Sequence, residues 1–188
     1  ETSEFQKRRK LLQMEMLYEV GLQLSSTLDP EQIFEEILMR SLVMVDARSA
    51  ALLKPDDDGK AFSVTNVSSP EEFPEILLTD PIVKKTWNQK SVSAITRSSN
   101  TWVNVCVIPL STKEYIGGLL VVADKEHRDG NVTPFEEEDL SLLQSFAYQA
   151  GAALNNAVLY RDLESSLVHL KKSQDQTEFV QSAFGNYL

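Results

Sequence analysis

Residues 105–124 read VCVIPLSTKEYIGGLLVVAD, two apolar runs separated by the short polar stretch STKEY. The second run, IGGLLVVAD, is almost continuously apolar, which is typical of a central strand of a sheet. The polar stretch is short enough to be a turn. This segment therefore predicts two strands joined by a turn, WVNVCVIPL (102–110) and IGGLLVVAD (116–124), the second of them central in a β-sheet.

Further strands are predicted on the N-terminal side of this segment. The stretch RSAALLK (48–54) has the pattern of a buried strand, and DDDG (56–59) is a turn sequence that leads into AFSVTNV (61–67). A further strand is expected at SVSAIT (91–96), whereas residues 68–78 resemble a loop. The sheet should thus contain about five or six strands.

Two acidic residues followed by proline mark expected helix starts. Asp29 is a good N-cap, and Pro30 suits the first helical position. In the same way, Thr79 or Asp80 can cap a short helix that has Pro81 in its first turn.

Longer helices are expected at both ends of the chain. Apolar residues recur every three or four positions over residues 5–26, and the last third is expected to be helical from about Pro134. The predicted fold class is α+β, with a central antiparallel sheet flanked by N- and C-terminal helices. We divide the chain into an N-terminal helix (1–28), a sheet domain (29–160) and a C-terminal helical linker (161–188).

Composition restricts the classes of partner. The chain has 18 basic and 28 acidic residues and a net charge of −10, which disfavours nucleic acid and anionic membranes. The basic run from Lys7 to Lys10 is expected to be a solvated helix face. A single cysteine, Cys106, and the lack of a 20-residue apolar run favour a cytoplasmic domain without membrane contact.

The inventory of reactive side chains does not favour catalysis. The two histidines, His127 and His169, lie far apart without ligand partners at metal-binding spacing, so no metal site is expected. Cys106 lies among apolar residues, as a buried structural cysteine would. Gly117 and Gly118 lie between strands rather than at a helix start, so they do not form a phosphate loop. We expect this chain not to be an enzyme.

Three stretches together resemble a GAF domain. These are LSSTLDPEQIFEEIL (24–38), the segment 105–125, and FEEEDLSLLQSFAYQAGAALNNAVLY (135–160), which occur in the order of that family. The resemblance implies a sensory or regulatory module with flanking signalling helices. The ending Phe184-Gly-x-Tyr-Leu188 resembles the segment that leads into class III nucleotide cyclase domains. The alternative is an ordinary helix end with a glycine near its C-cap.

Some GAF domains that bind cyclic nucleotides carry the pattern Asn-Lys, Phe and Asp-Glu, and this chain matches it in part. The matching residues are Asp124, Lys125, Phe135 and Asp139, with Asp in place of Asn and Leu140 in place of Glu. We expect Lys125 and Asp139 to form a charge pair.

The ligand itself is not predicted. The strand GLLVVA offers no polar group, and only RSSN (97–100) is present to cover a pocket, so cyclic nucleotide binding is disfavoured and no cofactor is expected. An unidentified small ligand remains an alternative. Four aromatic residues are candidates for lining or plugging the pocket, and simple core packing is favoured for most of them: Phe62, Phe73, Trp87 and Trp102.

The terminal helices are the strongest functional feature of the sequence. A helix from Phe135 to Phe184 would be roughly 75 Å long, far more than one domain can cover. A parallel homodimer would bury its apolar stripe, although polar Gln174 and Thr177 would weaken the seam. The alternative is a solvated helix that frays. The predicted seam residues are Leu11, Leu17, Leu154, Leu163, Leu167 and Leu170.

The expected function is therefore a regulatory GAF module that dimerises and signals to a C-terminal output domain, a class III adenylate or guanylate cyclase. One alternative is a GAF module of a histidine kinase or phosphodiesterase. Two others are a stand-alone small-molecule-binding domain and a purely structural dimerisation domain.

Overall fold

The computed structural model describes residues 2–97, 101–112 and 116–185. Within these residues, six antiparallel strands form one sheet in the order β2-β1-β5-β4-β3, and β6 pairs with the end of β5. This confirms the predicted fold class; the short β6 was not expected. The strands are β1 (Ala47–Pro55), β2 (Phe62–Ser68), β3 (Ser93–Thr96), β4 (Asn104–Ser111), β5 (Ile116–Glu126) and β6 (Val132–Thr133).

Residues 105–124 contribute to β4 and β5, near the centre of this sheet. Strand β5 pairs with β1 on one side and with β4 on the other, as its apolar run predicts. At Gly118 the backbone has φ 150°, and an added Cβ would lie 2.5 Å from the carbonyl oxygen of Leu53, so only glycine fits. Most of the predicted STKEY turn, residues 113–115, lies outside the described residues.

The helices begin where the caps predict. The Asp29 side chain accepts a hydrogen bond from the Glu31 N–H at 3.1 Å, and the Asp80 side chain accepts one from the Ile82 N–H at 3.0 Å. The last helix begins at Glu137, three residues after the expected start, and is 49 residues long. The helices are α1 (Thr2–Ser25), α2 (Pro30–Met44), α3 (Pro81–Gln89) and α4 (Glu137–Gly185), with a 3₁₀ turn η1 (Glu75–Thr79).

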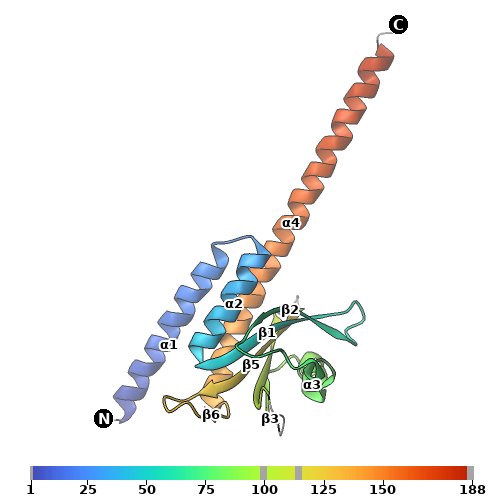
Figure 1. The fold of residues 1–188 in the computed structure, drawn as a ribbon. Coiled ribbons are helices and arrows are strands. Elements are labelled where there is room, and N and C mark those ends of the chain that lie inside the picture. Colours follow the sequence, from blue (N-terminus) through green and yellow to red (C-terminus); the bar gives the residue numbers. More distant parts are fainter. Residues whose placement is uncertain (1, 98–100, 113–115, 186–188) are drawn as a thin grey trace.

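The sheet separates two hydrophobic cores. Helices α2 and α4 cover one face, where Leu120 and Val122 of β5 point, and α1 packs against α4. Helix α3 and η1 cover the other face, where Leu119 and Val121 point. Figure 1 shows this layering, with α3 on the opposite side of the sheet from the three long helices.

Helix α1 runs parallel to α4. Arg9 forms an ion pair with Glu138 at 3.0 Å near the start of both helices. Farther along, Gly21 packs so closely on Gln149 that an added Cβ would lie 2.8 Å from its Oε1. The two contacts have almost the same sequence offset, so the helices run in one direction side by side (Figure 1).

Candidate functional site

Asp124 has a structural role that the sequence did not predict. Its backbone adopts φ 58° within β5, a left-handed conformation that Asp and Asn tolerate better than most residues. The residue is 7% exposed, and its Oδ1 accepts a hydrogen bond from the Asn104 N–H at 2.8 Å. Asp124 therefore fastens the first residue of β4 to the central strand.

The predicted charge pair between Lys125 and Asp139 is present. Lys125 Nζ lies 2.7 Å from Asp139 Oδ2, and both side chains are mostly buried. The same oxygen accepts a hydrogen bond from the Glu136 N–H at 2.8 Å, at the start of α4. Phe135 packs against the core on the helical face. These motif residues thus join the end of β5 to the first turn of α4.

The four aromatic pocket candidates pack against one another in pairs. Phe62 and Trp87 meet edge to face at 5.7 Å, and so do Phe73 and Trp102 at 5.2 Å. Trp102 is fully buried, and its φ of 54° is unusual for a bulky residue. All four contribute to the core between the sheet and α3, so they fill this space by core packing.

An ion pair beside this aromatic layer was missed at the sequence level. Arg97 Nη2 lies 3.4 Å from Asp80 Oδ2, and the two side chains are only 12% and 14% exposed. Asp80 was recognised as a helix cap, but its second role depends on how α3 packs on the sheet. The remaining residues of the RSSN stretch, 98–100, lie outside the described part of the chain.

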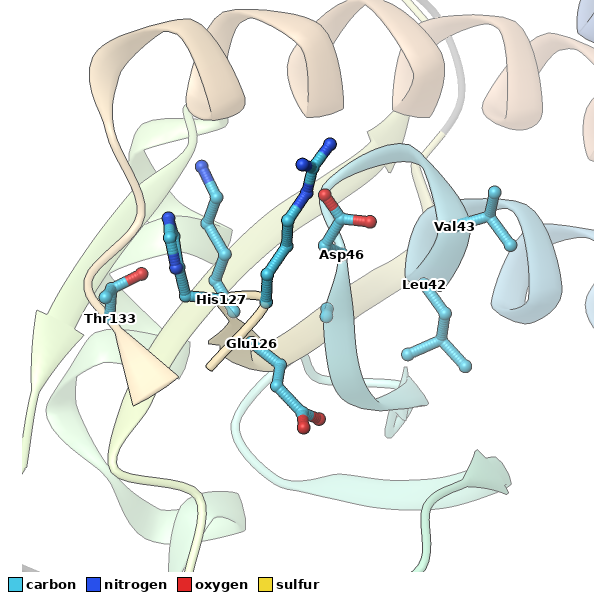
Figure 2. A pocket seen from close by; sticks show the side chains of 9 residues that line it. Leu42, Val43, Asp46, Glu126, His127 and Thr133 are labelled. Atoms are coloured by element: carbon cyan, nitrogen blue, oxygen red, sulfur yellow. The ribbon is translucent and has the colours of Figure 1, made fainter. Parts of the chain in front are cut away.

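An open depression of about 740 Å³ lies at the end of the sheet, between α2 and the β5–β6 turn. Figure 2 shows Leu42 and Val43 on the α2 side, His127 and Thr133 on the opposite side, and Asp46 between them. Lys125 and Arg128 also line it, together with Glu126. Since acidic residues stand among the basic ones and Lys125 is paired with Asp139, the depression does not form a concentrated anion site.

Within the described ranges, no group of three or more His, Cys, Asp or Glu side chains could hold a metal ion. Cys106 is fully buried in β4; burial raises the pKa of its thiol well above the usual range, and the charge of Asp139 raises it further. A thiol held neutral in this way is a poor nucleophile.

No helix of residues 2–97, 101–112 or 116–185 is long and apolar enough to cross a membrane.

The predicted seam residues divide into three groups. Leu11, Leu163, Leu167 and Leu170 are 60%, 59%, 51% and 62% exposed. Leu17 is half-buried against the core of its own chain. Leu154 is only 2% exposed because it packs in that same core, so its assignment to the seam is wrong.

Other exposed apolar residues were missed. Tyr18 and Leu22 point outward from α1, and Leu159 and Tyr160 from α4. Their signal was present in the apolar pattern of each helix. The pattern alone does not reveal which side of each helix faces the sheet.

Comparison with known proteins agrees with this architecture. The model of the GAF domain family matches residues 29–156. The chain belongs to the GAF domain family. The comparison with curated proteins finds no match.

Several solved GAF structures share the fold. The GAF domain of a protein described as a sensor histidine kinase from Pseudomonas syringae pv. tomato has a TM-score of 0.64 and 22% identity, over 87% of this chain and 99% of that one. The second GAF domain of DevS from Mycobacterium smegmatis has a TM-score of 0.59 and 20% identity, over 72% of this chain and 99% of that one. Residues 122–287 of a methyl-accepting chemotaxis protein have a TM-score of 0.59 and 13% identity, over 75% of this chain and 98% of that one. GAF domains of this kind thus occur in signalling proteins such as sensor kinases and chemotaxis proteins.

Proposed function

We propose that this GAF domain is the regulatory module of a cytoplasmic signalling protein, which dimerises through its terminal helices and transmits a change of shape along α4 to an output domain. One observation carries the proposal. The family match ends at residue 156, yet α4 continues to Gly185, and every described side chain from Leu159 to Ala183 is exposed. Figure 1 shows this part of α4 projecting away from the sheet.

A second copy of the chain is the best partner for the projecting helix. Leu163, Leu167 and Leu170 recur at spacings of four and three, which places them on one line, as in a coiled coil. An isolated helix gains little stability without tertiary packing, so an exposed leucine line favours association. In a parallel pair related by a two-fold axis, each leucine meets its own copy.

Helix α1 extends this surface beside the domain. Leu11, Tyr18 and Leu22 are 60%, 67% and 56% exposed, whereas Val20 and Leu24 of the same helix are buried. Since α1 runs parallel to α4, both helices can join one bundle around a common axis. Gln174 and Thr177, farther along the leucine line, would make the seam weak and sensitive to register.

The dimer is tested by light scattering of the purified protein over a dilution series. The double variant Leu163→Ser/Leu167→Ser is expected to shift the protein towards monomer. Asp162→Ser/Lys172→Ser is the matched control, because it places the same serines on the helix away from the leucine line. A wild-type protein that stays monomeric at high concentration would refute dimerisation and favour the stand-alone small-molecule-binding domain. A dimer that no compound stabilises in a ligand screen would favour a purely structural dimerisation domain.

The output domain that we propose is a class III nucleotide cyclase. Its support is the resemblance of Phe184–Leu188 to the segment that precedes such domains. The similar GAF domain from a sensor histidine kinase favours a kinase as the second candidate, and a phosphodiesterase is a third. An assay of the full-length protein separates them: cyclic nucleotide formed from ATP or GTP, autophosphorylation, or cyclic nucleotide hydrolysis. The GAF domain itself is proposed to have no catalytic role.

A further inference from the structure

The start of α3 is fixed to the edge of the sheet by one carboxylate with two partners. Asp80 Oδ1 caps the helix by accepting from the Ile82 N–H at 3.0 Å, while Asp80 Oδ2 pairs with Arg97 at 3.4 Å. Arg97 follows β3, and its N–H donates to the Val103 carbonyl at 2.7 Å. Any movement of the α3 N-terminus therefore acts on the ends of β3 and β4.

Side-chain hydrogen bonds continue from this point across the sheet. Thr96 Oγ1, beside Arg97, donates to Asn104 Oδ1 at 2.9 Å. The Asn104 N–H donates to Asp124 Oδ1 at 2.8 Å. Asn104 and Asp124 are 4% and 7% exposed, so water cannot readily replace a lost partner.

The next residue of β5 reaches the helix on the other face. Lys125 pairs with Asp139 at 2.7 Å, and Asp139 also accepts from the Glu136 N–H at 2.8 Å. Asp139 lies in the first turn of α4. The contacts therefore link the cap of α3 to the first turn of α4 through three neighbouring strands, with the backbone joining Arg97 to Thr96 and Asp124 to Lys125.

We propose that this polar chain from Asp80 to Asp139 couples the position of α3 to the start of α4, and so carries a movement of α3 to the projecting helix. The inference rests on the proposed function, because it treats α4 as the output helix. Its physical basis is that all of its side chains except that of Thr96, which is exposed, are mostly buried, and that each contact holds two members in place. Leaving one unpaired costs more there than at the surface, so both ends tend to move together.

Hydrogen exchange of backbone amides, followed by mass spectrometry on the whole chain, measures this coupling. Arg97→Gln removes the charge that holds Asp80. It is expected to speed exchange in the first three turns of α4, from Glu137 to Phe146, by about tenfold. Exchange at Val121 and Val122 in the centre of β5 should change by less than about twofold, which separates coupling from global destabilisation.

Two further variants complete the test. Arg48→Gln is the matched control, because Arg48 forms a surface pair with Glu71 at 3.9 Å outside the chain of contacts, and α4 should not respond to it. Thr96→Val removes the hydroxyl link to Asn104 with little change in volume. Adding Arg97→Gln to Thr96→Val should then have no further effect on α4.

The results that overturn the coupling are specific. An exchange increase confined to α3 and β3, a uniform increase that includes β5, or additive effects of the two substitutions would each refute it. Measuring the exchange response of α4 in the monomeric Leu163→Ser/Leu167→Ser protein as well separates a failure of the coupling from a failure of the proposed function. If the chain never dimerises but α4 still responds to Arg97→Gln, only the dimer proposal fails; a dimer whose α4 does not respond refutes only the coupling.

Discussion

The carboxylate of Asp124 holds the backbone N–H of Asn104 at 2.8 Å, at the point where β4 begins beside β5. A side chain thus replaces the backbone acceptor that a regular ladder would supply. This contact explains why a residue with a short polar side chain occupies a left-handed position inside the central strand.

Asp124→Ala is expected to lower the free energy of unfolding by about 2 kcal/mol. The buried Asn104 N–H would lose its acceptor, and alanine tolerates a positive φ less well than aspartate. Asp124→Asn keeps both an acceptor and the local conformation, so its cost should stay below about 1 kcal/mol. Urea unfolding monitored by tryptophan fluorescence measures both; equal losses would show that the contact to Asn104 is not the cause.

The ion pair between Lys125 and Asp139 should contribute to stability more than a surface pair does. Lys125→Met and Asp139→Asn are each expected to cost about 1–2 kcal/mol, because both side chains are mostly buried. The double variant should cost less than the sum of the two. Unfolding in urea gives the three values, and strict additivity would mean that the pair makes no net contribution.

Gly118→Ala should destabilise the protein far more than Gly21→Ala. An added Cβ at Gly118 would lie 2.5 Å from the backbone oxygen of Leu53, whereas at Gly21 the close atom belongs to the flexible side chain of Gln149. We expect a cost of at least about 2 kcal/mol at Gly118 and under about 1 kcal/mol at Gly21, where alanine also favours the helix. Thermal unfolding compares the stability of the two variants, and similar melting temperatures would contradict the expected difference.

Leu154 and Leu163 should behave differently although they lie on one helix. Leu154→Ala empties space in the core and should cost about 2–5 kcal/mol of unfolding free energy. Leu163→Ala changes an exposed residue, so it should affect dimer dissociation and leave the stability of the isolated domain nearly unchanged. Urea unfolding of the dilute, monomeric protein separates the two, and a large loss for Leu163→Ala there would contradict the assignment.

Cys106 should make stability depend on pH on the alkaline side. Because burial raises the pKa of this thiol in the folded state, only the unfolded chain forms the thiolate near its ordinary pKa. The contribution of the neutral Cys106 thiol to the free energy of unfolding is therefore fully present below about pH 8.5. Above that pH it falls by about 1.4 kcal/mol per pH unit. Comparison of unfolding free energies from pH 7 to 10 should show this slope in the wild type and its loss in Cys106→Ala. Parallel pH profiles would show that the thiol is ionised in the folded protein.

Part of the candidate site could be predicted from sequence. The Lys125–Asp139 pair followed from the spacing of a motif in the family that the chain resembles. Asp80 was one of two predicted caps, with Thr79, because the signal, a following proline, is local. Arg97, Thr96 and Asn104 carried no such signal, since an arginine or threonine at a strand end has many ordinary explanations. Their roles depend on β3, β4 and the α3 cap meeting at one edge of the sheet.

Local sequence signals predict most of the secondary structure: a helix start at Asp29, another at Thr79 or Asp80, the apolar strand that ends at Asp124, and the long last helix. These features depend on hydrogen bonds and apolar spacing within a few residues of each position, so one chain suffices to predict them. Which leucines are buried depends on how the helices pack, because helical periodicity does not specify which side of a helix meets the sheet. That packing buries Leu154 and leaves Leu163 exposed, and it places Asp139 where Lys125 can bind it.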